Sequence, residues 1–325
     1  PPRFVPQSDE EAADGLRVAQ AVGQPVVIQG GGSQYHLSPA LPPVDGRSEG
    51  GVLLSTEKLR GVVAYAPEDL YVTVRAGTPL ADLQAALAAD GLWAPLVSPW
   101  AESTIGGIVS TNLNGPQRMR YGAVRDMVLG MRVVLPDGRC LRLGRPLVKN
   151  VAGYDMAKLF VGAYGTLGLI TEVTLRLSPL PRLRRSLWVA VDDLAMALTL
   201  GRSLLNLSHV ASAVLLCRGC PTPSDVLAAP HLLAFSAEGH PQDVLAELRT
   251  ARAALTASGI GADAITETDV LAGADLWAGL LRGGSVALRI GVPPRDLPAY
   301  LEANAAALAG DGAAMMPHVA DFVSG

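Results

Sequence analysis

The sequence lacks the features typical of membrane-spanning and nucleic-acid-binding proteins. No run of 18 or more apolar residues is present, so a membrane-spanning helix is not expected. Only 17% of the 325 residues are charged, the net charge is −4, and Lys and Arg form no runs. Without a basic surface the chain has no electrostatic attraction for phosphodiesters, and we expect no nucleic-acid partner.

Cysteine is also scarce, which bears on both location and metal binding. Three cysteines are too few for a disulfide framework and are typical of a reducing compartment, so we expect a cytoplasmic protein, or one peripheral at the inner membrane through partners. Cys217 and Cys220 have C-x-x-C spacing, but no second pair follows and the nearest histidines, His209 and His231, are single. We therefore expect no metal site.

Targeting and catalytic motifs are missing as well. The first residues, Pro-Pro-Arg-Phe-Val, show no basic region followed by an apolar stretch, although a start other than Met is compatible with a processed leader. The second half of the sequence, from Pro179 onward, contains no HExxH, GxSxG or GK[ST] string. We therefore find no catalytic constellation of these kinds in that half.

The composition that is present favours short elements in two domains. Hydrophobic residues make up 49% of the chain, and 35 Gly and 24 Pro indicate many turns. In the first half, residues 8–22 read as a helix capped by Ser8, followed by a strand at 25–28. Thr78 is expected to cap a helix starting at Pro79. The order of strands and helices predicts an α+β fold.

Four glycine-rich strings dominate the first half. They are Gly30-Gly31-Gly32-Ser33, Ser103-Thr104-Ile105-Gly106-Gly107, Tyr121-Gly122 and Gly165-Thr166-Leu167-Gly168-Leu169-Ile170-Thr171-Glu172. The first follows a strand, but Tyr35 replaces the third glycine of a Rossmann motif and prolines soon follow, which excludes that fold. A backbone nest for a pyrophosphate or a plain flexible turn remains.

Other candidate residues have structural alternatives. Residues 104–109 could begin a helix whose free N–H groups face an anion. Asp126 and Asp155 read more readily as capping or ion-paired groups than as catalytic ones.

In the second half the predicted β-α-β-β-α-β order, closing with a strand at 286–292, indicates an antiparallel sheet with helices on one face. A strand is predicted to begin at Trp188. Arg282 and Arg289 could pair with a carboxylate substrate or be solvated surface residues.

With these strings in view, residues 5–178 resemble flavoproteins of the vanillyl-alcohol oxidase type, which have a p-cresol methylhydroxylase (PCMH)-type FAD-binding domain. The string Lys149-Asn150-Val151-Ala152-Gly153-Tyr154-Asp155 and the short length are similar to the FAD-binding subunits of bacterial glycolate oxidases. The resemblance implies a two-lobed FAD-binding domain over residues 1–178 and a smaller antiparallel α+β, ferredoxin-like cap domain over residues 179–325.

The resemblance also implies a set of cofactor-binding residues. These are Gly30, Gly31, Gly32, Ser33, Gln34, Pro99, Thr104, Ile105, Gly106, Gly107, Tyr121, Gly122, Gly168, Ile170 and Thr171. Related proteins that attach FAD covalently often use a histidine in or beside the first glycine loop. Here Ser33-Gln34 occupies that place and His36 lies beyond it, so the expected cofactor is non-covalent FAD.

The implied function is that of an FAD-binding component of a glycolate oxidase-type 2-hydroxy acid dehydrogenase. Its expected partners are a larger FAD-containing catalytic subunit and an iron–sulfur subunit, and the complex would oxidise a small 2-hydroxy acid such as glycolate or D-lactate. The HxGDGNxH string of the larger relatives is absent, and no catalytic residue is assigned. Two alternatives remain: a self-sufficient FAD-dependent oxidase, assisted by Tyr121, Arg125 or Lys149, and a structural subunit with a degenerate flavin site.

Overall fold

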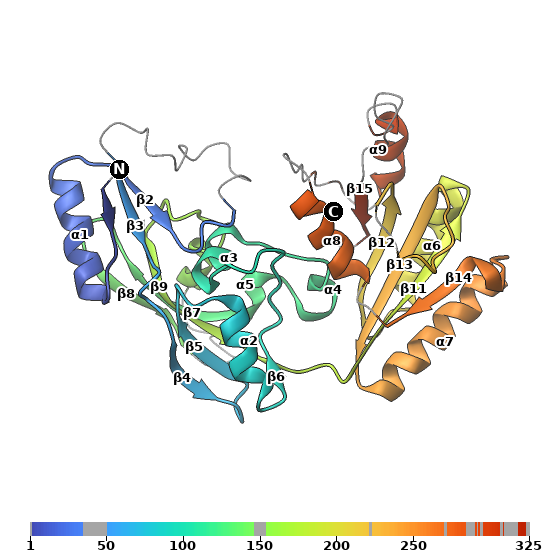
Figure 1. The fold of residues 1–325 in the computed structure, drawn as a ribbon, viewed down its shortest axis with the longest axis horizontal. Helices are drawn as coiled ribbons and strands as arrows, with labels where there is room; N and C mark the ends of the chain where they lie inside the picture. Colours follow the sequence, from blue (N-terminus) through green and yellow to red (C-terminus); the bar gives the residue numbers. More distant parts are fainter. Residues whose placement is uncertain are drawn as a thin grey trace. The chain divides into compact units, whose positions relative to one another are not determined.

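The fold is divided into two compact units (Figure 1). The computed structural model describes residues 2–34, 51–145, 154–220, 223–269, 272–283, 290, 292, 295–305, 308 and 318–322. Unit 1 consists of Pro1–Asn114 and Gly122–Leu180, and unit 2 of Gly115–Tyr121 and Pro181–Gly325. The sequence predicted a single boundary near residue 178. It did not predict that Gly115–Tyr121 groups with the second half.

Unit 1 begins with a small parallel sheet covered by a helix. Strands β1 (Arg3–Phe4), β3 (Val52–Ser55) and β2 (Val26–Gln29) lie in that order. Helix α1 (Asp9–Ala21) starts where the Ser8 hydroxyl accepts a hydrogen bond from the Glu11 N–H, as predicted. Its apolar face joins the strands in a core, and β2 delivers the first glycine string at its C-terminal end.

A five-stranded antiparallel sheet forms the rest of unit 1, in the order β4-β5-β9-β7-β8. Its strands are β4 (Val62–Ala66), β5 (Tyr71–Arg75), β7 (Val128–Val134), β8 (Cys140–Gly144) and β9 (Leu169–Arg176). A further pair joins β6 (Leu92–Trp93) to β10 (Ser178–Pro179). The helices are α2 (Leu80–Ala88), α3 (Ile105–Thr111), α5 (Val124–Met127) and the 3-10 turn η2 (Met156–Leu159).

Unit 2 is an antiparallel sheet in the order β14-β11-β13-β12-β15. Its strands are β11 (Leu183–Val191), β12 (Ala211–Arg218), β13 (His231–Gly239), β14 (Ile265–Thr268) and β15 (His318–Asp321). Its helices are α4 (Arg118–Tyr121), α6 (Leu194–Asn206), α7 (Pro241–Ala257), α8 (Ala272–Gly283) and α9 (Leu297–Ala303), with the turn η3 (Ala262–Ala264). The β-α-β-β-α-β path through β11, α6, β12, β13, α7 and β14 is the predicted ferredoxin-like arrangement.

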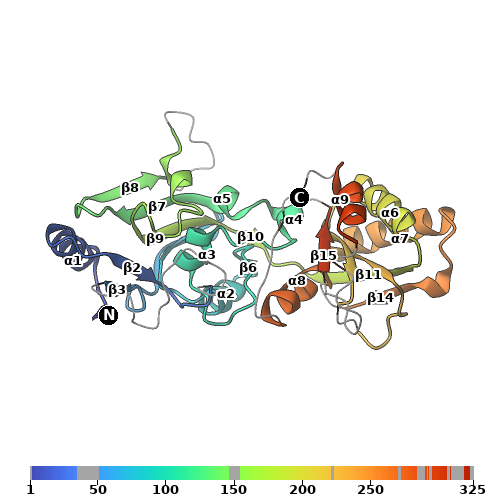
Figure 2. The same ribbon diagram turned by 90° about the horizontal axis from the view of Figure 1, so that it is seen from above.

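The two faces of the unit 2 sheet are covered differently. Helices α6 and α7 lie on one side and α8 on the other (Figure 2). Because side chains alternate along a strand, Leu187 and Phe235 join the α6/α7 core whereas Trp188 and Ala234 join the α8 core. The same alternation decides which polar residues share the α8 side.

Two local predictions differ from the structure, each for a physical reason. The strand that closes the ferredoxin-like order is β14, not the predicted strand at 286–292. The sequence of β14 is short and partly polar, so it gives little indication of a strand. Most of residues 286–292 lie outside the described residues. Strand β11 begins at Leu183 rather than Trp188, because Arg184 and Arg185 form ion pairs with carboxylates on neighbouring strands. Cross-strand pairing therefore extends a strand through a basic segment.

Two of the predicted helix caps also differ from the structure. Helix α2 begins at Leu80 after Pro79, and the Thr78 hydroxyl instead donates to the Arg75 carbonyl at 2.7 Å. Asp155 makes no side-chain cap and lies 3.7 Å from Lys158, whereas Asp126 accepts a hydrogen bond from the Ala123 N–H. Both aspartates therefore have the structural roles that the sequence favoured over catalysis.

A buried ion-pair network joins α1 to the large sheet. The Asp9 carboxylate, 2% exposed, lies 2.9 Å from Arg75 and 2.8 Å from Arg132. Glu172 on β9 lies 3.3 and 3.6 Å from the same two guanidiniums. The Asp9–Arg132 contact is an ion pair without hydrogen-bond alignment. Two carboxylates and two guanidiniums thus compensate one another where the helix meets the strands.

Across the described parts of the chain, none of the helices has the length and apolarity needed to cross a membrane.

We expect Asp9→Asn to lower the free energy of unfolding by about 1–3 kcal/mol, because Arg75 and Arg132 lose a buried counter-charge while keeping some solvent. The matched control is Asp14→Asn, which removes an exposed carboxylate paired with Arg17 on the same helix. Urea unfolding of both variants measures the difference. Equal effects of the two substitutions would contradict a stabilising role for the network.

Candidate functional site

The first glycine string lies against the loop that precedes α3. A Cβ on Gly31 would lie 1.8 Å from the Glu102 carbonyl oxygen, and one on Gly30 would lie 2.3 Å from the Thr104 hydroxyl. Neither position can accept a larger residue without moving its neighbour. The glycines therefore allow two segments of unit 1, more than 60 residues apart in the sequence, to touch through their backbones.

The glycine string also offers unused hydrogen-bond donors. The backbone N–H groups of Gly30, Gly31, Gly32 and Ser33 donate to no acceptor within the described ranges. Gly31 is exposed, and the other three residues are half-buried. Consecutive free N–H groups form a concave set of dipoles that attracts anions.

Three hydroxyl groups connect this string to the neighbouring loop. The Ser33 and Ser103 oxygens lie 2.9 Å apart, and the Ser98 and Ser103 oxygens 2.6 Å apart. Ser103 is 1% exposed, so its buried hydroxyl holds the hydroxyls of Ser33 and Ser98 in place. The sequence prediction included Ser33 among the binding residues but omitted Ser98 and Ser103. The contact of Ser103 with Ser33 depends on the approach of the two loops.

The start of α3 differs from the prediction that its N–H groups are free. The N–H groups of Ile105 and Gly106 donate to the carbonyls of Thr78 and Ala76, and the Gly107 N–H donates to the Thr104 hydroxyl. Protein acceptors therefore use these donors. Within this string, Gly107 is half-buried whereas Thr104, Ile105 and Gly106 are buried.

The last glycine string contributes one close neighbour and several core residues. A Cβ on Gly165 would lie 3.3 Å from Ile28, so this loop comes beside β2. Gly168, Ile170 and Thr171 are buried, and a Cβ on Gly168 would lie 2.9 Å from the Val134 carbonyl. Packing of β9 thus accounts for these three residues, and their contact with a ligand stays a prediction.

The remaining predicted residues are divided between the two units. Pro99 is buried and Gln34 half-buried in unit 1. Gly122 has a φ of 89° and begins the turn closed by Asp126, whereas the preceding Tyr121 groups with unit 2. Burial raises the pKa of Tyr121 to about 12, with a further contribution from the Glu238 charge. Tyr121 therefore keeps its hydroxyl proton at neutral pH.

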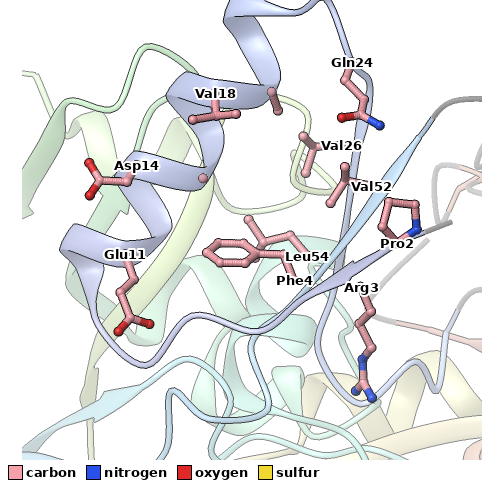
Figure 3. A pocket seen from close by; sticks show the side chains of 12 residues that line it. Pro2, Arg3, Phe4, Glu11, Asp14, Val18, Gln24, Val26, Val52 and Leu54 are labelled. Atoms are coloured by element: carbon pink, nitrogen blue, oxygen red, sulfur yellow. The ribbon is translucent and has the colours of Figure 1, made fainter.

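Unit 1 also has a surface hollow away from these residues. It lies between α1 and the parallel sheet and holds about 480 Å³ (Figure 3). Phe4, Val18, Val26 and Leu54 line it, together with the carboxylate residues Glu11 and Asp14. Nothing in it resembles a catalytic arrangement.

Several predicted residues lie outside the described residues. These are His36, Lys149 and Arg289, together with most of the string 149–155. The structure therefore adds nothing on their roles.

Comparisons with known proteins show what the first half of the chain is similar to. Residues 3–144 match the family model described as an FAD binding domain. Over 175 residues the chain is 42% identical to glycolate oxidase subunit GlcE of Escherichia coli, which covers 53% of this chain and 48% of that protein. It is 33% identical over 195 residues to glycolate oxidase subunit GlcD of Bacillus subtilis, covering 60% of this chain and 40% of that one.

A third relative is the mitochondrial D-lactate dehydrogenase [cytochrome] of Arabidopsis thaliana, 35% identical over 177 residues, or 54% of this chain and 30% of that protein. The chain thus spans less than half the length of each of these relatives.

Solved structures share the fold. A p-cresol methylhydroxylase with substrate bound superposes with a TM-score of 0.69 at 18% identity, covering 85% of this chain and 61% of that one. An alkyldihydroxyacetonephosphate synthase gives 0.68 at 20% identity, covering 81% and 52%. These likenesses confirm the predicted PCMH-type architecture. The family match and the relatives above, rather than these structures, support FAD as the cofactor of residues 3–144.

Proposed function

We propose that this chain is an FAD-binding component of a glycolate oxidase-type 2-hydroxy acid dehydrogenase complex. The observation that carries the proposal is the FAD binding domain at residues 3–144, in a region that is 42% identical to a glycolate oxidase subunit. A D-lactate dehydrogenase among the relatives supports a small 2-hydroxy acid as the substrate class. Bound FAD would supply the two-electron acceptor for such an oxidation.

The residues of unit 1 fit the cofactor. The pyrophosphate of FAD is anionic, and the unused N–H groups of Gly30, Gly31, Gly32 and Ser33 are suited to it. The hydroxyl chain through Ser103 holds the same loop in place. Gln34, Pro99, Thr104, Gly107 and Gly122 would extend the contact along the cofactor. Ser33 and Gln34 offer no histidine for attachment, which supports non-covalent FAD.

The proposal includes domains and partners. Residues 1–178 would form the FAD-binding domain and residues 179–325 the second domain. The word "subunit" in the names of two relatives supports a hetero-oligomer, with a larger FAD-containing catalytic subunit and an iron–sulfur subunit as the partners. The three cysteines, which form no disulfide within the described residues, support a cytoplasmic location, with any attachment to the inner membrane made through those partners.

We expect Gly31→Ala to weaken FAD binding at least about tenfold, because the new Cβ would meet the fixed Glu102 carbonyl and move the loop that carries the free N–H groups. Titration of the apoprotein with FAD, followed by flavin fluorescence, measures the affinity. Gly279→Ala is the matched control, since a Cβ on that helical glycine would meet no atom of the described residues within 4 Å. Equal affinities of wild type and Gly31→Ala would refute the assignment of this loop to the cofactor.

The second experiment tests the division of labour. The purified FAD-loaded chain is mixed anaerobically with glycolate or D-lactate, and the visible flavin spectrum is recorded alone and with the co-purified partner subunits. We expect slow or no reduction alone and fast reduction in the complex. Rapid bleaching of the lone chain would instead show a self-sufficient dehydrogenase, and a chain unable to take up FAD would show a structural subunit.

A further inference from the structure

One outer edge of the large sheet in unit 1 is apolar and exposed. Strand β4 pairs with β5 on one side, and no other described strand lies along its outer side (Figure 1). Its sequence is Val-Val-Ala-Tyr-Ala, and the first four of these residues are exposed. Val62 and Val63 are 48% and 49% exposed. The backbone along the outer side of an edge strand is a template on which another strand can pair.

The opposite edge of the same sheet differs in its charge. Strand β8 carries Arg142 at its centre, and this residue is exposed. A charged side chain in the middle of an edge strand disfavours pairing with a second chain. Strand β4 has no charged residue between Val62 and Ala66. The β4 edge therefore lacks the protection that the β8 edge has.

The charges on either side of β4 are separated by sign. Lys58 and Arg60 precede the strand, and Glu68 and Asp69 follow it. All four residues are exposed, and none of them forms an ion pair with another described residue. When two identical strands pair antiparallel, the start of each lies beside the end of the other. Such a pair sets the basic end of each copy against the acidic end of the other, so the edge is complementary to itself.

Two copies of β4 have one register that matches these charges. If Ala64 lies on the two-fold axis, Arg60 of each copy lies opposite Glu68 of the other, and the symmetry forms this pair twice. Moving the axis by one residue in either direction places Arg60 opposite Leu70 or Ala66 instead. Charge therefore selects the register centred on Ala64.

The same register also pairs apolar side chains. Val63 of each copy lies opposite Tyr65 of the other, and β-branched and aromatic residues make favourable cross-strand pairs. The Tyr65 ring is already held in place, because its O–H donates to Asp90 Oδ2 at 2.8 Å. A β-bulge between Val62 and Ala64 limits the regular part of the edge to a few residues. The area that such a pair buries is therefore small, and we expect a weak dimer.

We propose that two copies of this chain form a dimer through antiparallel pairing of their β4 strands, with Arg60 of each copy beside Glu68 of the other. The two five-stranded sheets then continue into one another across the axis. None of the cofactor-binding residues proposed above belongs to β4, so each copy keeps its own FAD. The dimer is independent of the substrate and of the partner subunits.

Sedimentation velocity of the full FAD-loaded chain tests the dimer. Between about 1 and 200 µM protein we expect a shift from monomer to dimer, weakened by added salt because the ion pairs are exposed. Ala64→Lys places two ammonium groups side by side on the axis and is expected to weaken the dimer at least about tenfold. The control is Ala85→Lys, which adds the same charge at an exposed position of α2 and should dimerise within about twofold of wild type.

Exchange of charges tests the register. Arg60→Glu and Glu68→Arg each set like charges opposite one another in a homodimer, and each is expected to weaken it at least about tenfold. A mixture of these two variants restores both opposite-charge pairs, as does the double variant Arg60→Glu, Glu68→Arg, and both are expected to associate within about threefold of wild type. Arg142→Glu, on the opposite edge of the sheet, is the control and should leave the dimer within about twofold of wild type.

Two kinds of result would overturn the dimer. One is a chain that stays monomeric over the whole concentration range. The other is a dimer that Ala64→Lys and both single charge reversals leave within about twofold of wild type, because its interface would then lie elsewhere. If the chain is monomeric and Ala64→Lys prevents co-purification of the partner subunits, the β4 edge pairs with a partner strand and the second copy is excluded.

Discussion

The close approach of two backbones at Gly31 and Glu102 is the constraint on which unit 1 depends. Because a Cβ would lie 1.8 Å from the carbonyl oxygen there, only glycine allows the loop after β2 to touch the loop before α3. That contact brings Ser33 to Ser103 and leaves consecutive N–H groups without acceptors among the described residues. The glycines therefore serve the packing of unit 1 first, and the proposed contact with the cofactor would use the backbone that this packing holds in place.

The two units handle charge in opposite ways. In unit 1, Asp9 and Glu172 share Arg75 and Arg132, so a buried network is balanced within the protein. In unit 2, the buried Glu238 carboxylate pairs with one guanidinium, that of Arg184, and burial raises the pKa of this carboxyl. A network whose charges balance is less costly to bury than a carboxylate with a single charged partner.

Much of the fold could be predicted from local patterns. The Ser8 cap and the ferredoxin-like order follow from spacing and periodicity, which depend on near neighbours in the chain. The errors arose where distant partners decided the outcome. Arg184 continues β11 because Glu238 lies opposite it, and the N–H of Gly106 is used by the Ala76 carbonyl rather than left for an anion. Neither partner can be read from the residues on either side.

By itself the sequence predicted the type of fold and the cofactor, the cofactor through the resemblance of its glycine strings to those of flavoproteins of the vanillyl-alcohol oxidase type. It also predicted an FAD-binding half and a second half. Only the tertiary structure decided that the short segment Gly115–Tyr121 packs with the second unit. That placement, which sets Arg120 beside Gly239 and near Glu238, depends on contacts more than 100 residues apart in the sequence, and no local pattern encodes them.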